Sequence, residues 1–89
     1  MKRRALNRDF RALVVRRYAS AREACGFTQS ELADLIEVSP PCIAMFEAGR
    51  SLLRADKLFE AATVLGISLD EVCREWAVHE GLLPAEVVA

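Results

Sequence analysis

Apolar side chains recur every three or four positions through most of the chain, which is the spacing of one face of an α-helix. The first such run begins near Asn7, a good capping residue, and ends at Gly26, a common helix terminator. Its apolar positions are Leu6, Phe10, Leu13, Val14, Tyr18, Ala21 and Cys25. No segment alternates apolar and polar residues as a half-buried β-strand does. The pattern therefore predicts an all-α protein whose first helix covers about 18 residues.

Helix-capping residues predict a second and a third helix in the middle of the chain. Thr28 and Glu31 have the spacing of a capping box, so a short helix is predicted over 29–36. After a tight turn, Ser39 is a good cap, and the proline that follows it suits a first helical position because that position needs no N–H. The third helix is predicted over 40–48.

Two more helices follow a loop at 50–54. The fourth is predicted to end at Gly66, and Ser68 opens the fifth with a second capping box before that helix stops near Gly81. The positions predicted to face the core are Leu58, Ala61, Ala62 and Leu65 in the fourth helix, and Leu69, Val72, Cys73 and Trp76 in the fifth.

Three stretches carry a known pattern: GFTQSELADLIEVS at 26–39, FEAGR at 46–50 and LGISLDEV at 65–72. Over roughly residues 18–73 the chain resembles the Cro/C1 family of helix-turn-helix proteins, also called lambda-repressor-like or XRE-type. The resemblance implies a five-helix domain with an extended basic first helix, in which about 29–48 forms the helix-turn-helix. It also implies a structural ion pair between Arg22 and Glu47, which joins the first helix to the third. Relatives usually carry Gly where Glu37 stands, so either Glu37 adopts a positive φ, at a cost of about 1 kcal/mol, or the turn differs.

On this basis the chain divides into a basic N-terminal arm at 1–7, a helix-turn-helix domain at 8–81 and an apolar C-terminal tail at 82–89. The apolar residues of the tail are Leu82, Leu83, Val87 and Val88, and Pro84 interrupts them. The tail could cover the core, form a dimer seam or bind a partner as an antitoxin-like subunit would. These alternatives stay open at the level of the sequence.

In this family the third helix enters the major groove, and polar side chains on its exposed face bind base edges. The corresponding positions in this chain are apolar: Pro40, Pro41, Ala44 and Met45. None can form the paired hydrogen bonds that give about 1–3 kcal/mol of discrimination each. The loop after the helix is also apolar at its centre, with Leu52 and Leu53, where relatives are polar or basic. Contiguous exposed apolar residues are typical of protein contacts, although these two leucines have the alternative of packing inward.

We therefore interpret Pro40, Pro41, Ala44, Met45, Leu52 and Leu53 as a protein-binding surface. The predicted function is that of a transcriptional regulator that binds and sequesters another transcription factor, in particular an activator. In this respect the chain is similar to small helix-turn-helix antiactivators that restrain the transfer of conjugative elements. The basic segment 2–4 and the acidic remainder of the chain would steer the encounter.

The alternative is a sequence-specific DNA-binding repressor of the Cro/C1 type, expected to be a dimer. Its candidate nucleic-acid contacts are Gln29, Arg50, Arg54, Lys2, Arg3 and Arg4. Because the third helix offers few hydrogen bonds, sequence preference would come mostly from DNA shape. Such binding would weaken steeply as salt increases.

The charge distribution keeps both hypotheses open. The 89-residue chain has a formal net charge of −1. However, residues 1–22 carry eight Lys or Arg and one Asp, for a net charge of +7, while residues 23–89 carry four bases and twelve acids, for −8. A basic arm of this kind suits either a nucleic acid or an acidic protein.

Other classes of function find little support in the composition. The single histidine, His79, has no Cys or Ser in a catalytic relation to it, so we do not expect an enzyme. Three cysteines without a CxxC spacing argue against a zinc site and fit reduced thiols, which favours a cytoplasmic protein. We expect no cofactor, no metal and no small-molecule ligand, and no apolar stretch approaches the roughly 20 residues of a membrane span.

Overall fold

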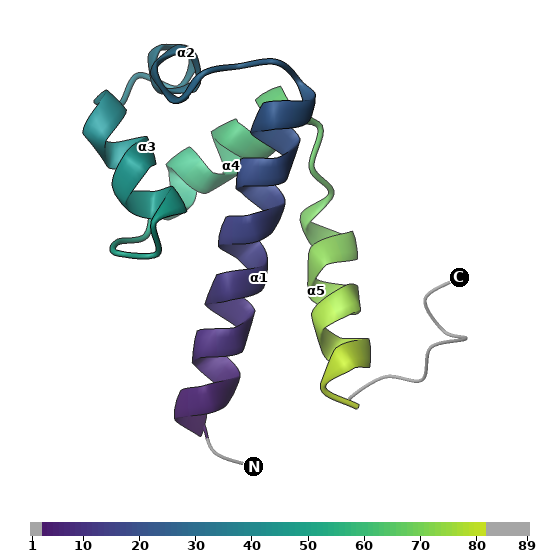
Figure 1. Cartoon of the computed structure of the whole chain (residues 1–89). Helices are drawn as coiled ribbons and strands as arrows, with labels where there is room; N and C mark the ends of the chain where they lie inside the picture. The colour runs from purple at the N-terminus through teal and green to yellow at the C-terminus, as the bar shows by residue number, and fades with distance from the viewer. Residues whose placement is uncertain (1–2, 82–89) are drawn as a thin grey trace.

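Five helices make up the part of the chain that the structure describes, which is the backbone of residues 3–81 and the side chains of residues 10–81. In this computed structural model they are α1 (Arg3–Ala24), α2 (Gln29–Leu35), α3 (Pro40–Glu47), α4 (Ala55–Leu65) and α5 (Leu69–His79). α5 lies beside α1, whereas α2, α3 and α4 gather around the C-terminal half of α1 (Figure 1). No strand occurs within residues 3–81, so the predicted all-α, five-helix class is confirmed.

α1 is longer than the sequence pattern predicts. It begins at Arg3 and has 22 residues, so it extends over roughly 33 Å. Asn7, the predicted cap, lies inside the helix, and residues 3–7 of the predicted arm belong to α1. The residues immediately before Asn7 are Arg, Arg, Ala and Leu, which all favour helix, and this outweighs the preference of Asn for a cap.

Side-chain caps start two of the short helices. Thr28 Oγ1 accepts a hydrogen bond from the backbone N–H of Glu31 at 3.0 Å, and Glu31 Oε1 accepts one from the N–H of Thr28 at 2.8 Å. The predicted capping box of α2 is therefore confirmed. Ser68 Oγ likewise accepts from a backbone N–H in the first turn of α5, at 3.2 Å. Ser39 makes no side-chain cap, because prolines occupy the first two positions of α3 and the N–H of Cys42 donates to the Ser39 carbonyl.

The turn between α2 and α3 needs a left-handed residue, and Glu37 supplies it with a φ of 57°. The N–H of Val38 donates to the Ala33 carbonyl at 2.9 Å, and that of Glu37 to the Asp34 carbonyl at 3.2 Å. These two bonds form the Schellman pattern of helix ends. Of the two alternatives predicted for Glu37, the positive φ is therefore the one that occurs. α3 ends in the same way at Gly49, with a φ of 76°.

Tyr18 connects three helices at the centre of the core. Its ring packs edge-to-face on Phe46 of α3, with centroids 5.5 Å apart, and its hydroxyl donates to the carbonyl of Leu58 in α4 at 2.8 Å. Burial raises the pKa of Tyr18 to about 12, because the phenolate would lose its hydration. The buried apolar residues are Tyr18, Leu32, Ala33, Ile36, Ile43, Phe46, Leu53, Ala61, Ala62, Leu65 and Val72.

α5 also packs against α1. Trp76 of α5 meets Phe10 of α1 edge-to-face, with 5.1 Å between ring centroids, and Val72 is buried. Cys73, predicted to face the core, is exposed, because it lies about 100° around the helix from Val72. Cys25 is exposed as well, because it lies beyond the last residue of α1.

Candidate functional site

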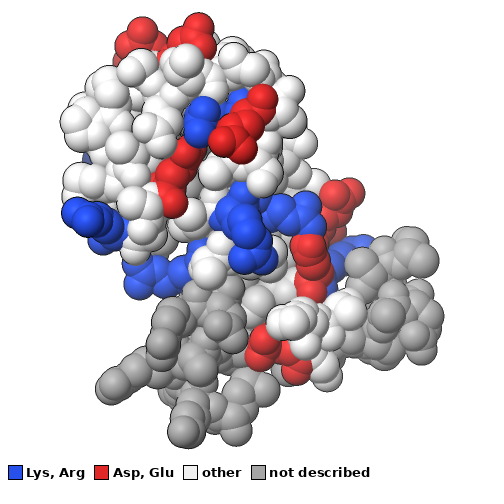
Figure 2. All heavy atoms as spheres, in the orientation of Figure 1, with Lys and Arg blue, Asp and Glu red and all other residues white. Residues whose placement is uncertain are grey.

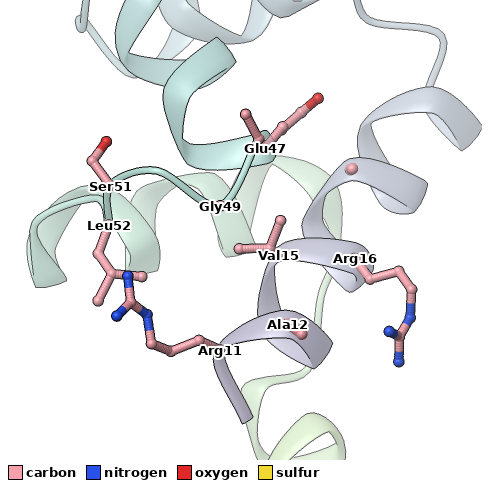
Figure 3. A pocket seen from close by; sticks show the side chains of 10 residues that line it. Arg11, Ala12, Val15, Arg16, Glu47, Gly49, Ser51 and Leu52 are labelled. Atoms are coloured by element: carbon pink, nitrogen blue, oxygen red, sulfur yellow. The ribbon is translucent and has the colours of Figure 1, made fainter. Parts of the chain in front are cut away.

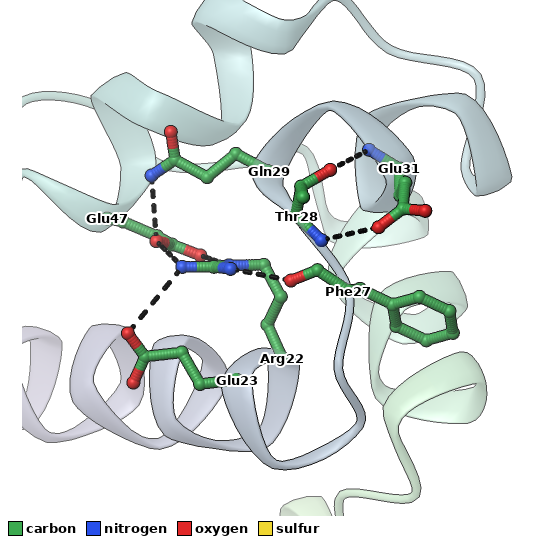
Figure 4. Close-up of polar contacts among 7 residues, drawn as sticks. All are labelled: Arg22, Glu23, Phe27, Thr28, Gln29, Glu31 and Glu47. Atoms are coloured by element: carbon green, nitrogen blue, oxygen red, sulfur yellow. Dashed lines mark hydrogen bonds and ion pairs between the residues drawn. The ribbon is translucent and has the colours of Figure 1, made fainter.

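A largely buried ion pair fastens α3 to α1. Arg22 Nε donates to Glu47 Oε2 at 2.7 Å, and Arg22 Nη2 donates to Oε1 at 3.0 Å (Figure 4). The two side chains are only 12% and 10% exposed. Arg22 Nη1 also donates to the carbonyl of Phe27, in the loop before α2, at 2.7 Å. The ion pair that the family resemblance implies is therefore present, and it orients the C-terminal end of α3.

Gln29 completes this network from the first residue of α2. Its Nε2 donates to Glu47 Oε1 at 2.9 Å. Burial alone would raise the pKa of Glu47, but the hydrogen bonds from Arg22 and Gln29 and the charge of Arg22 outweigh it, so this pKa is lowered. Gln29, predicted to contact phosphate, thus uses one of its two amide N–H groups inside the protein. A phosphate contact by the other N–H stays a prediction.

α3 presents apolar residues on two opposite faces. Ile43 and Phe46 are 0% and 1% exposed and belong to the core. The outer face carries the residues singled out in the sequence, Pro40, Pro41, Ala44 and Met45. Met45 is 46% exposed, both prolines are exposed and the alanine is half-buried. The outer face of α3, meaning these four residues, is therefore available to a binding partner.

The two leucines of the α3–α4 loop have opposite environments. Leu52 is 51% exposed and lies on the surface. Leu53 is only 6% exposed and belongs to the core cluster. The assignment of Leu53 to a protein-binding surface is therefore wrong, because burial in the core removes this side chain from any partner. Its burial instead stabilises the loop against the rest of the domain.

Exposed cations lie at the two ends of the same loop. Arg50 is exposed, and its backbone N–H donates to the Met45 carbonyl at 2.9 Å. Arg54 has a side chain that is 86% exposed, and its Nε lies 3.5 Å from a carboxylate oxygen of Asp56. Such an exposed pair holds the guanidinium only weakly. The remaining predicted phosphate contacts fall on Lys2 and on the side chains of Arg3 and Arg4, which lie outside the described residues.

Charge is unevenly distributed over the surface. On the face shown in Figure 2, Lys and Arg side chains lie along the left edge and across the middle. Asp and Glu side chains lie at the top, where Figure 1 places α2, in the upper middle beside a Lys or Arg side chain, and on the right, where Figure 1 places α5. The left edge is also the side of the α3–α4 loop. The surface near this loop is therefore better suited to anions than the surface of α2.

Within residues 3–81, no helix is long and apolar enough to cross a membrane. Among the side chains that the structure describes, no three His, Cys, Asp or Glu residues come together in a group that could hold a metal ion.

α2 and α3 together define the class of the protein. They are joined by a tight turn, the second of them is tied to α1 by an ion pair, and one face of it is free, which is the arrangement of a helix-turn-helix domain. A helix-turn-helix family model matches residues 19–72, from within α1 to the first turn of α5. The chain belongs to the Cro/C1-type helix-turn-helix family.

One curated relative matches most of the chain. The cryptic phage CTXphi transcriptional repressor RstR of Vibrio cholerae serotype O1 (strain ATCC 39315 / El Tor Inaba N16961) is 38% identical over 64 residues. The aligned part covers 72% of this chain and 57% of the relative, so the chain spans little more than half the length of that protein. No solved structure matches the chain significantly.

Proposed function

We propose that the protein is a DNA-binding transcriptional repressor of the Cro/C1 type that acts as a dimer. The observation that carries this proposal is the exposed outer face of α3, which lies near Arg50 and Arg54. The Arg22–Glu47 pair fixes α3 to α1. A helix held in this way can enter the major groove without a change of fold. The similarity to a phage transcriptional repressor supports the same function.

The apolar outer face of α3 limits how this repressor recognises sequence. Met45 and Ala44 cannot form paired hydrogen bonds with base edges, but they can make van der Waals contact with thymine methyl groups in the major groove. The two prolines at the start of α3 also lack the N–H groups with which a helix N-terminus binds phosphate. Sequence preference would therefore come from thymine methyl groups and from DNA shape.

Arg50 and Arg54 supply the electrostatic part of the binding. They lie at the two ends of the α3–α4 loop and can contact phosphates beside the groove that α3 enters. Each phosphate that a cation neutralises releases counterions and adds about 0.9 to the salt slope. Affinity should therefore fall steeply as salt increases.

The proposal is tested by selecting duplexes from a randomised DNA library and measuring their binding against salt concentration. We expect a selected site that contains thymine, and replacing both Arg50 and Arg54 with Ala should lower the slope of log affinity against log salt by about 2. Arg74→Ala is the matched control, because Arg74 is an exposed cation of α5 beside Asp70. Absence of enrichment together with absence of binding at low salt would overturn the proposal.

Replacing thymine with uracil in the DNA distinguishes a contact with the thymine methyl group from recognition of DNA shape. Uracil lacks the thymine methyl group, so placing it at a contacted position should weaken binding by about fourfold, the value of one buried methyl group. Met45→Ala should remove this difference between the two bases. Equal affinity of the wild-type protein for both duplexes would rule out the methyl contact and leave DNA shape as the source of preference.

A second candidate function is supported by the exposure of Met45 and Leu52. Adaptable apolar side chains on one surface suit a protein partner, such as a transcriptional activator that the regulator would sequester. A nuclease-treated pull-down should then retain that activator with the wild type and lose it with Met45→Glu. Phe59→Glu is the control, since Phe59 is a 61% exposed apolar side chain of α4. Capture that disappears with nuclease treatment would count against this second function.

A further inference from the structure

A hollow of about 500 Å³ lies between the middle of α1 and the α3–α4 loop (Figure 3). Its α1 side includes Ala12 and Val15, and its loop side includes Ser51 and Leu52. Most of the α1 side precedes residue 19, where the match to the family model begins. The hollow therefore depends mainly on the part of α1 before residue 19, which the matched domain does not include.

The base and one rim of this hollow are apolar. Val15 is half-buried and points from α1 toward the loop, and Leu52 at the rim is 51% exposed (Figure 3). The volume lies in the range of cavities that bind ligands. An apolar side chain that entered the hollow would remove part of Leu52 from water, which is favourable.

Two arginines make part of the rim of the hollow positive. Arg11 extends toward Leu52, and Arg16 lies at the opposite edge and points away from the loop (Figure 3). Both are exposed, and within the described residues neither takes part in an ion pair. Glu47 also borders the hollow, but its two carboxylate oxygens are already engaged in the network with α1 and α2. A carboxylate that approaches Arg11 therefore meets little opposing charge.

We propose that this hollow docks an amphipathic peptide segment of a partner protein, with a leucine-like side chain in the hollow and a flanking Asp or Glu on Arg11. Charge complementarity favours this occupant, because the base is apolar, part of the rim is cationic, and Arg binds a carboxylate through two parallel hydrogen bonds. An apolar base offers nothing to a sugar-phosphate backbone. The surface shares only Leu52 with the residues proposed above for a partner of α3, and it does not depend on DNA binding.

Two synthetic helical peptides test the proposal on the full chain. One carries a ridge of leucines flanked by glutamates, and the other carries the same leucines flanked by lysines. In amide NMR titrations, the glutamate peptide should shift the resonances of Ala12, Val15 and Leu52. It should also bind at least about tenfold more tightly than the lysine peptide.

Reversing the charge of Arg11 on α1, and of Arg74 on α5 as a control, tests whether Arg11 selects the glutamate peptide. Arg11→Glu should abolish the preference for the glutamate peptide, whereas Arg74→Glu on α5 should keep it, with circular dichroism confirming that both variants fold. Equal binding of the two peptides, shifts confined to another surface such as that of Phe59, or no saturable binding would each overturn the proposal. A short DNA duplex that shifts the same amides at lower concentration than the glutamate peptide would assign the hollow to nucleic acid and would also overturn it.

Discussion

The guanidinium of Arg22 and the carboxylate of Glu47 form a bidentate ion pair between α1 and α3, with 2.7 Å between Nε and Oε2. Because both side chains are largely buried, removing one of them deprives the other of its main charged partner in a poorly solvated place. The contact also receives Gln29 from α2. The Glu47 carboxylate of α3 is therefore linked to both α1 and α2, and these contacts position the outer face of α3.

Replacing Arg22 with Ala should lower the free energy of unfolding by about 3 kcal/mol, because Glu47 then stays buried with only the hydrogen bond from Gln29. Urea unfolding followed by circular dichroism measures this loss. Arg17→Ala is the control, since Arg17 pairs with Glu75 at the surface and its loss should cost about 1 kcal/mol or less. Equal losses for the two variants would contradict the difference in burial between the two pairs.

Lowering the pH should decrease the free energy of unfolding, because Glu47 becomes protonated. Burial alone would raise its pKa, but the hydrogen bonds from Arg22 and Gln29 hold the pKa below the ordinary 4.5. The unfolded chain therefore takes up this proton first, so the stabilising contribution is present above about pH 4.5 and is lost as pH falls through the folded pKa. Urea unfolding at a series of acidic pH values measures the loss, and Glu47→Gln should lack it. The same acid dependence in that variant as in the wild type would refute the assignment.

Alkaline pH should act on Tyr18 in the opposite direction. Burial raises its pKa to about 12 in the folded state, so its contribution is complete below about pH 10 and is lost as pH rises toward 12. Tyr18→Phe removes the hydrogen bond to the Leu58 carbonyl and should cost about 1 kcal/mol at neutral pH. The difference between wild type and variant, measured by urea unfolding, should shrink above pH 10. A difference that stays constant would show that Tyr18 ionises equally in both states.

The neighbouring leucines of the α3–α4 loop should respond very differently to truncation. Leu53→Ala leaves a cavity in the core and should cost about 2–3 kcal/mol of unfolding free energy. Leu52→Ala, at a half-exposed position, should stay within about 0.5 kcal/mol of the wild type. Thermal or urea unfolding of the two variants side by side measures both values. A larger loss for Leu52→Ala would reverse the two assignments.

Glycine at the turn between α2 and α3 should stabilise the protein. Glu37 has a φ of 57°, a conformation that costs a residue with a side chain about 1–2 kcal/mol and costs glycine almost nothing. Part of that gain is offset by the greater freedom of glycine in the unfolded chain, so Glu37→Gly should gain about 0.5–1 kcal/mol. Glu37→Ala, which keeps the strain and removes the charge, should gain nothing. A gain of equal size in both variants would attribute the effect to charge.

Most helix ends could be predicted because they depend on neighbouring residues. Thr28 and Glu31 start α2 at the predicted residue, and Gly66 follows the last residue of α4. The start of α1 could not be predicted in this way, because Asn7 is compatible with both a cap and a helix interior, and the choice depends on the residues before it. Ser39 shows the same limit, because Pro41 has no N–H to donate and the N–H of Cys42 donates to the Ser39 carbonyl and not to the Ser39 hydroxyl.

The site could be predicted only in part. The resemblance to a known family identified the Arg22–Glu47 contact and the outer face of α3, since both follow from positions within a shared fold. It could not separate Leu52 from Leu53, because a loop has no regular period that tells which side chain turns inward. The position of Arg11 beside the loop was missed as well, since it depends on contacts between distant parts of the chain.

Tyr18 and Arg22 of α1 lie one helical turn apart, and they hydrogen-bond to α4 and α3 respectively. The direction in which each earlier side chain of α1 points depends on how many helical residues separate it from Tyr18. Deleting a single residue between Phe10 and Tyr18 would rotate the N-terminal half by about 100° about its axis. Phe10 would then turn away from Trp76 and Arg11 would leave the hollow, while the helix-turn-helix stayed intact. The side of α1 that a partner would meet is therefore set by the number of residues along the helix, and a one-residue insertion or deletion would change it.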